Sequence, residues 1–160
     1  MCKELSFGYY GKDIYCIWNN YVVTMEVNGS PNTGYSVDVC FLDPFKNTTK
    51  KITVVTNDTT ENIKRAVACT YDNLYVSCNR SFCVFDKSLN FKKYSDFLPE
   101  NVAEIKYLYN YGDLGIFIIP YYGDIWYYYK NGTISKYTES ASSLQYTKNG
   151  HKYNLGSNNY

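Results

Sequence analysis

Few residues of this 160-residue chain have the type and spacing needed for acid–base or nucleophilic chemistry. The one histidine, His151, lies in the polar stretch 148–152, with no serine, cysteine or aspartate beside it in a nucleophile pattern. An exposed turn histidine is therefore expected there rather than a catalytic base. The sequence also contains no Gly-x-Ser-x-Gly elbow, phosphate-binding loop, dinucleotide fingerprint or His-Glu-x-x-His motif. We expect no catalytic residue of these kinds.

A pair of carboxylates could still act as general acid and base, because such pairs leave no local motif. The aspartates considered are Asp13, Asp38, Asp58, Asp72, Asp113 and Asp124. Aspartate is common in turns, where its side chain bonds the neighbouring backbone, so most of these positions are expected to be turn residues. An enzyme with carboxylates at the centre of the fold remains the third functional hypothesis.

Metal binding is not expected from the six cysteines, Cys2, Cys16, Cys40, Cys69, Cys78 and Cys83. They form no Cys-x-x-Cys pair, and His151 has no cysteine nearby, so a zinc site and other cofactors are not expected. Residues 1–6 lack the apolar run of a secretory signal. The sequence therefore predicts reduced cysteines and a cytoplasmic protein, or an extracellular one if this N-terminus is not native.

Composition predicts a folded domain with no preference for nucleic acid. Hydrophobic residues make up 45% of the chain, and 16 Lys and Arg balance 15 Asp and Glu. A nucleic-acid-binding protein normally shows a basic excess, because neutralising phosphates supplies much of its affinity. No stretch approaches the eighteen apolar residues of a membrane span, so neither nucleic acid nor membrane is expected as a partner. The length fits a single domain, 1–160.

An internal repeat is the strongest signal in the sequence. Matching segments lie 42 or 43 residues apart, namely 74–76 with 116–118, 82–85 with 125–128, and 91–94 with 134–137. An earlier copy is recognisable at 39–43, which lies 43 residues before 82–86 and shares its Cys and Asp. The repeat predicts units at about 12–58, 63–97 and 104–139, and a partial unit at 144–155 that residues 4–10 could complete.

Each full unit is expected to hold four strands, because segments rich in β-branched and aromatic residues alternate with turn-forming pairs. These pairs are Asn19-Asn20, Asp72-Asn73, Gly112-Asp113 and Asn131-Gly132. The expected strands are 13–18, 21–27, 36–43 and 51–56; 65–71, 74–78, 82–86 and 90–95; 104–110, 114–120, 125–129 and 133–138; and 144–147 with 152–155. The first unit carries an insertion, 28–34, whose Gly, Pro and Asn content predicts a long loop. At most one helical turn is expected near 59–62 and another near 99–103.

Four short antiparallel strands repeating every 40 to 50 residues resemble the blades of β-propeller proteins such as the WD40 and kelch classes. The resemblance covers about residues 12–155 and concerns period and strand pattern alone. The Gly-His and Trp-Asp pairs of WD40 blades and the paired glycines of kelch blades are missing. The resemblance implies an all-β fold of four-stranded antiparallel repeats of about 43 residues, as a small or partial ring. A β-sandwich is the alternative.

A binding surface is expected where the longer loops gather, because function often resides on variable loops held by a rigid scaffold. The candidate residues are Asn79, Arg80, Tyr121, Tyr122, Asp124 and Trp126. Tyr121 and Tyr122 are adjacent between apolar strands and cannot both face one core, so one of them should be exposed. Trp126 is expected in the strand core or, in a ligand-binding protein, stacked on a sugar or base.

Three functions are compatible with these residues. The leading hypothesis is a non-catalytic binding or scaffold module that presents one loop face to a protein partner. The second is a propeller that binds a small ligand or glycan through its tyrosines, and the third is the carboxylate enzyme. A homo-oligomer is expected if the ring is incomplete, because the blade faces left in water must then be covered.

Overall fold

The computed structural model describes residues 14–60, 63–94, 104–140, 145–148 and 151–154. Within these residues the chain is all-β and contains no helix. The chain divides into two compact units, 1–63 and 64–160. Residues 4–10, which we expected to complete a fourth repeat, and the short helical turn expected near 99–103 lie outside the described residues.

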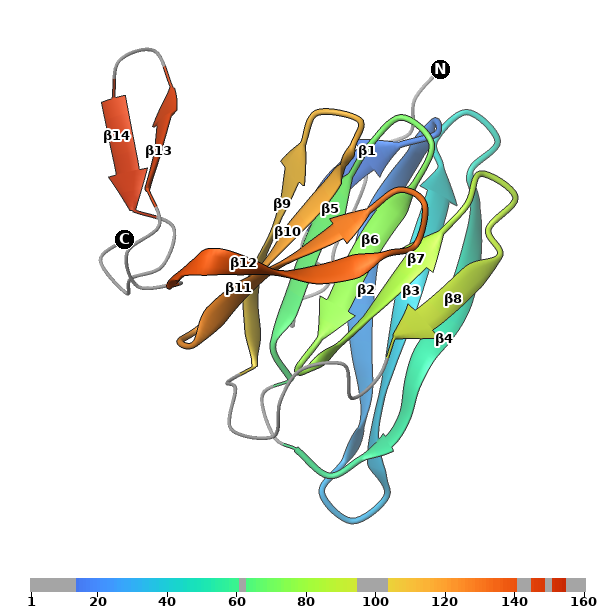
Figure 1. Ribbon diagram of the computed structural model, residues 1–160. Helices are drawn as coiled ribbons and strands as arrows, with labels where there is room; N and C mark the ends of the chain where they lie inside the picture. The colour runs from blue at the N-terminus through green and yellow to red at the C-terminus, as the bar shows by residue number, and fades with distance from the viewer. Residues whose placement is uncertain (1–13, 61–62, 95–103, 141–144, 149–150, 155–160) are drawn as a thin grey trace. The chain divides into compact units, whose positions relative to one another are not determined.

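The first unit is one antiparallel sheet in the order β1-β2-β3-β4 (Figure 1). Its strands are β1 (Ile14–Trp18), β2 (Tyr21–Ser30), β3 (Gly34–Asp43) and β4 (Thr48–Asp58). The turn between β1 and β2 consists of Asn19 and Asn20, with φ angles of 50° and 63°. Two positive φ values in a two-residue loop give the twist that strand pairs prefer, and asparagine tolerates them better than most residues.

The insertion in the first unit does not form the long loop expected at 28–34. Strands β2 and β3 continue through it, with Asn28 paired to Ser36 and Ser30 paired to Gly34. The Ser30 backbone N–H donates to Thr33 Oγ1 at 3.1 Å, and the Thr33 N–H donates to the Ser30 carbonyl at 3.2 Å. These local bonds close a tight turn over residues 31–33, so the insertion lengthens a hairpin instead of opening a loop.

The second unit contains two further four-stranded sheets and a hairpin (Figure 1). One sheet has β5 (Arg65–Cys69), β6 (Leu74–Cys78), β7 (Ser81–Phe85) and β8 (Phe91–Tyr94) in that order. The other has β9 (Ile105–Tyr111), β10 (Gly115–Pro120), β11 (Asp124–Tyr129) and β12 (Ile134–Ser140), again with consecutive strands adjacent. The strands β13 (Gln145–Lys148) and β14 (His151–Asn154) pair with each other.

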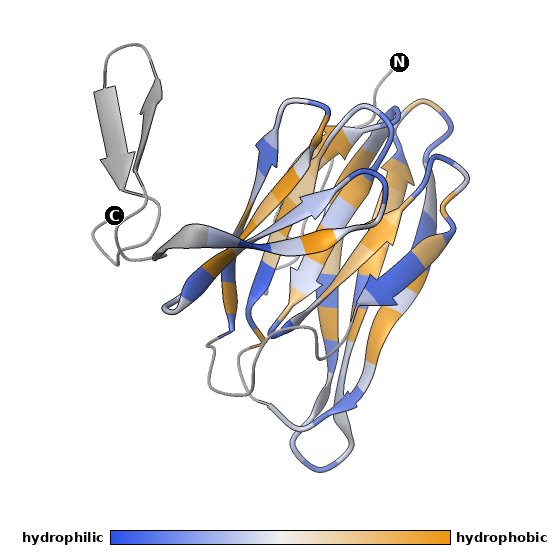
Figure 2. Cartoon of the chain, viewed as in Figure 1, coloured by the Kyte–Doolittle hydropathy of each residue, from blue (hydrophilic) through white to orange (hydrophobic). Residues whose placement is uncertain are grey.

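The core of the second unit is shared by its two four-stranded sheets. Residues of both sheets meet in one cluster: Ala66, Tyr75, Phe82, Ile105, Leu108, Ile116, Ile118 and Tyr128. The Phe82 ring centroid lies 5.5 Å from that of Tyr128 and 4.9 Å from that of Tyr94. The central strands β7 and β10 are accordingly among the most hydrophobic parts of the chain (Figure 2). The two sheets therefore pack face to face, as successive blades of a repeat do.

The expectation of repeated four-stranded antiparallel units is confirmed for three copies. Each strand expected within the described residues is present, with ends displaced by at most a few residues. The largest difference is β4, which begins three residues earlier than expected, at Thr48, where it pairs with Asp43, and extends two residues further, to Asp58, where it pairs with Tyr35. The described sheets are compatible with a propeller-like repeat and do not assign the chain to a propeller family.

Cys40 and Cys83 occupy the third strand of the first and second repeats and are both buried. Burial raises the pKa of the Cys83 thiol from 9.0 to about 11, and the positive charge of Lys93 opposes this effect. A buried thiolate lacks hydration, so the folded protein holds the protonated form.

The free energy of unfolding is therefore expected to fall as pH rises from about 9 to about 11. Below pH 9 the thiol is protonated in both states; above it the unfolded thiol ionises first, which favours unfolding. The expected contribution is about 2–3 kcal/mol. Urea denaturation of the wild type and of Cys83→Ala across this range measures it, since Cys83→Ala keeps the other titrations. Equal pH dependence in the two proteins would contradict the assignment.

Candidate loop site of the second unit

One end of the second unit is organised by Asn79, in the turn between β6 and β7. The Lys64 backbone N–H donates to Asn79 Oδ1 at 2.9 Å, and the Asn79 N–H donates to the Lys64 carbonyl at 2.8 Å. The Ile105 N–H donates to the Asn79 carbonyl at 2.7 Å. Asn79 has a φ of 53°, a left-handed conformation that asparagine tolerates. The turn of one sheet is thereby fastened to the first strand of the next.

Tyr121, in the turn between β10 and β11, lies at the same end. Its backbone N–H donates to the Glu104 carbonyl at 3.1 Å. The ammonium nitrogens of Lys64 and Lys106 lie 6.0 and 5.5 Å from its ring centroid. Cations at this distance from an aromatic face are attracted by the ring quadrupole, which favours one orientation of the ring. We define the loop end of the second unit as Lys64, Asn79, Arg80, Glu104, Lys106, Tyr121 and Tyr122.

Tyr122 is the most exposed aromatic side chain of this end, at 63% of its full accessible area. Tyr121 beside it is half-buried, so the expectation that one of the two tyrosines is exposed is confirmed. Arg80 follows Asn79 and is half-buried. The loop end thus presents an exposed phenol beside a half-buried one, with cationic side chains around them.

Asp124 and Trp126 of strand β11 differ from the other predicted site residues. Asp124 Oδ2 lies 2.9 Å from Lys136 Nζ, in a partly exposed ion pair that links β11 to β12. Trp126 packs against the core cluster that the two sheets share. Its Nε1–H is buried, with no acceptor among the described residues. The structure therefore brings Asn79, Arg80, Tyr121 and Tyr122 together at the loop end and places Trp126 at the core.

Lys64 and Lys106 were not among the residues that the sequence singled out. Each follows an isoleucine at the start of its repeat, in Ile63-Lys64 and Ile105-Lys106, so the repeat itself carried the signal. Their approach to one ring depends on the stacking of two sheets, which no local pattern specifies.

The opposite end of the second unit, which we call the turn end, consists of short hydrogen-bonded turns. Asp86 Oδ1 accepts from the Ser88 and Asn90 backbone N–H groups at 2.9 and 3.1 Å. Tyr71 is 74% exposed there, and Lys87 Nζ lies 3.3 Å from its ring centroid. This end therefore offers an exposed tyrosine with a cationic neighbour that can serve as a matched control for Tyr122.

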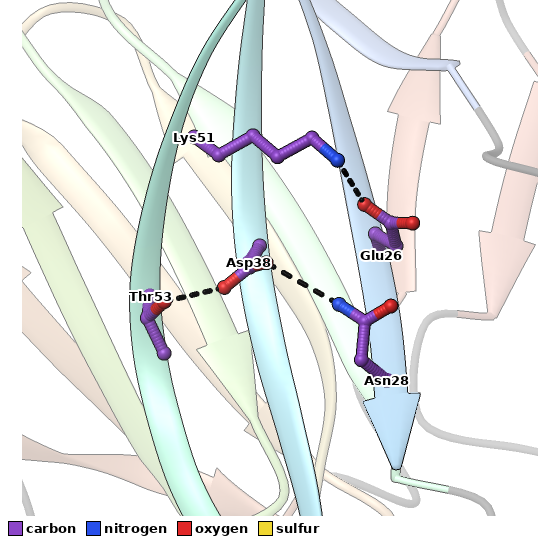
Figure 3. Close-up of polar contacts among 5 residues, drawn as sticks. All are labelled: Glu26, Asn28, Asp38, Lys51 and Thr53. Atoms are coloured by element: carbon purple, nitrogen blue, oxygen red, sulfur yellow. Dashed lines mark hydrogen bonds and ion pairs between the residues drawn. The ribbon is translucent and has the colours of Figure 1, made fainter.

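A second polar cluster lies on one face of the first sheet (Figure 3). Glu26 and Asp38 are direct register partners on β2 and β3, an arrangement of like charges that is unfavourable unless each is compensated. Glu26 Oε2 accepts from Lys51 Nζ at 2.9 Å. The carboxylate of Asp38 accepts from Thr53 Oγ1 at 2.6 Å and from Asn28 Nδ2 at 3.3 Å.

This carboxylate pair has the contacts of a structural network. The hydrogen bond and charge of Glu26 raise the pKa of Lys51, so the ammonium form is favoured. Asp38 is held by uncharged donors from both neighbouring strands. Each carboxylate already has a cross-strand partner, which explains how two acidic residues can lie opposite one another on an exposed sheet face.

The remaining chemical candidates give no site in the described part of the chain. Among those residues, no group of three or more His, Cys, Asp or Glu side chains could hold a metal ion. The described segments also contain no helix long and apolar enough to cross a membrane. His151, which is expected in a turn, is instead the first residue of β14, where it pairs with Lys148 of β13.

No protein-family model, curated protein or solved structure matches the chain.

Proposed function

We propose that the chain is a non-catalytic binding module that presents the loop end of the second unit to a protein partner. The observation that carries the proposal is the pair Tyr121 and Tyr122. Tyr122 is exposed, and Tyr121 beside it lies within 6.0 Å of two lysine ammonium groups. Tyrosine and arginine are enriched in the energetically dominant centres of protein interfaces, and Arg80 lies at the same end as the two tyrosines.

The hydrogen bonds that hold the turns of the loop end favour the same function. Asn79 fastens its turn to both sheets, and the Tyr121 N–H bonds the Glu104 carbonyl, so the backbone of these two turns has little conformational entropy to lose when a partner binds. The net charge of +1 gives no general attraction to polyanions, so recognition would rest on the local arrangement. A partner surface with an apolar centre for Tyr122 and carboxylates near Lys64 and Lys106 would fit this end.

Photo-crosslinking from position 122 tests the proposal. A photoreactive phenylalanine analogue replaces Tyr122 in one variant and Tyr71 in the matched control. Each variant is incubated with an extract of the native cells and irradiated. We expect a discrete crosslinked protein from position 122, because the partner contacts the loop end, and none from position 71 at the turn end. The comparison is fair because both positions hold exposed tyrosines. Identical products from both positions would contradict a site at the loop end.

A glycan or small ligand is the other occupant that this test can reveal. If position 122 gives no protein product, and a glycan or nucleotide raises the melting temperature of the wild type but not of Tyr121→Ala, the site binds a small molecule. That outcome would replace the protein partner with the second hypothesis.

A further inference from the structure

The sheet β9–β12 has a second face that takes no part in the core shared with β5–β8 and carries a small buried cluster of its own. Seven aromatic residues on this face, which we call the tyrosine face, are Tyr107, Tyr109, Tyr111, Phe117, Tyr127, Tyr129 and Tyr137. Tyr107, Tyr109 and Phe117 pack on the buried side chains of Ile119 and Ile125. Their neighbours on the strands, Ile118 and Tyr128, point to the opposite face and belong to the shared core.

The rings of the tyrosine face form a contiguous layer. The Phe117 centroid lies 4.9 Å from that of Tyr127, 5.4 Å from that of Tyr137 and 5.6 Å from that of Tyr111. The Tyr127 and Tyr129 centroids are 4.3 Å apart. All of these contacts are edge-to-face, the arrangement that aromatic rings prefer. The layer is therefore an ordered surface within the sheet.

Part of this layer remains accessible. Tyr111 is 55% exposed and Tyr129 is 45% exposed, although Tyr127 between them is buried. A contiguous aromatic surface with exposed members is characteristic of a face on which another element packs.

The order of the chain indicates which element this is. The first strands of the second and third repeats begin at residues 65 and 105, and β13 begins at residue 145, so the spacing of 40 residues is kept. The third sheet packs on the second through their shared core. The hairpin β13–β14 therefore has the sequence position of the first two strands of a fourth repeat, for which the stacking surface is the other face of β9–β12.

The hairpin also requires such a surface. Its two strands have four residues each, and an isolated two-stranded hairpin is at best marginally stable in water. Its register pairs Tyr146 with Tyr153, which supplies aromatic residues of the type found on the tyrosine face. Four residues separate β12 from β13, which gives the hairpin a high effective concentration near the sheet.

We propose that the tyrosine face is a docking surface, and that its occupant is the β13–β14 hairpin of the same chain, stacked as the start of a fourth repeat. This inference is independent of the loop end and holds whether or not that end binds a partner.

Amide hydrogen–deuterium exchange of β13–β14 in the full chain tests the proposal. The wild type is expected to be monomeric, and its hairpin amides to exchange at least about tenfold more slowly than unstructured amides. The double variant Tyr111→Ser/Tyr129→Ser should lose this protection and keep that of β5–β8. The control Tyr71→Ser/Tyr122→Ser removes two exposed tyrosines outside the tyrosine face and should leave the hairpin protected.

A variant in the hairpin itself controls for the possibility that Tyr111→Ser/Tyr129→Ser removes protection by disrupting the sheet β9–β12. Tyr153→Ser leaves β9–β12 untouched and should also remove hairpin protection. An unprotected hairpin in the monomeric wild type would overturn the proposal, as would protection that survives both variants. A third outcome would also overturn it. If light scattering shows that the wild type is a dimer and that Tyr111→Ser/Tyr129→Ser is a monomer, and the hairpin is unprotected in both, the occupant of the tyrosine face is a second copy of the chain.

Discussion

Phe82→Ala is expected to lower the free energy of unfolding of the second unit by about 3–5 kcal/mol. Phe82 is fully buried, and its ring contacts Tyr94 of its own sheet and Tyr128 of the next. Truncation removes apolar contact area and leaves a cavity between two sheets that cannot close without moving both. The loss would consume much of the 5–15 kcal/mol typical of a folded domain. Urea denaturation followed by circular dichroism measures it.

Two further variants keep this prediction testable. Phe82→Leu retains most of the volume and should cost less than half as much, which matters if Phe82→Ala does not fold. Phe91→Ala removes the same ring from a partly exposed position on β8 and should cost about 1 kcal/mol. Similar losses for Phe82→Ala and Phe91→Ala would show that the two sheets do not share the core described above.

Gly115→Ala is expected to destabilise the second unit by about 3 kcal/mol or more. Gly115 begins β10 with a φ of 158° and pairs with both Tyr111 and Tyr129. A Cβ at this position would overlap the carbonyl oxygen of Tyr128 and approach the Tyr129 Cα at 3.1 Å. These are backbone atoms of the neighbouring strand, so the ladder between β10 and β11 would have to open.

Gly112→Ala is the matched control, three residues earlier in the same hairpin. Gly112 has a φ of 54°, and an added Cβ would meet no atom within 4 Å. Only the cost of a left-handed conformation applies there, about 1 kcal/mol. Thermal and urea denaturation of both variants provide the comparison. Equal destabilisation would mean that backbone conformation, rather than the close approach of β11, determines the effect at Gly115.

The repeat and most strand positions could be predicted from the sequence because each strand is short and bounded by strong turn residues. Asn19-Asn20 and Gly112-Asp113 are examples, and positive φ angles at Asn19, Asn20 and Gly112 match the expected turns. The prediction of a long loop at 28–34 was wrong, because β2 and β3 continue into this segment as a hairpin. Gly, Pro and Asn indicate that a turn is present but not how far the flanking strands extend. Only the cross-strand register, such as Gly29 with Tyr35, reveals that length.

The candidate site was predictable in part for a related reason. The exposure of one residue of the pair Tyr121 and Tyr122 followed from their adjacency, since successive residues cannot both face one core. The approach of Lys64 and Lys106 to the Tyr121 ring depends on the packing of two sheets. The tyrosine face was also only partly predictable. Strand alternation places Tyr127 and Tyr129 on the same side of the sheet, but it does not indicate which element packs on that side.

The dissociation constant of the partner captured at position 122 tests the proposed binding function most directly. Tyr122→Ala is expected to weaken binding by about tenfold or more, as truncation of an interface centre does, and Tyr71→Ala should change it by less than about twofold. Both variants should retain the wild-type free energy of unfolding, since both side chains are largely exposed. A larger loss from Tyr71→Ala than from Tyr122→Ala, or no loss from either, would contradict a binding site at the loop end.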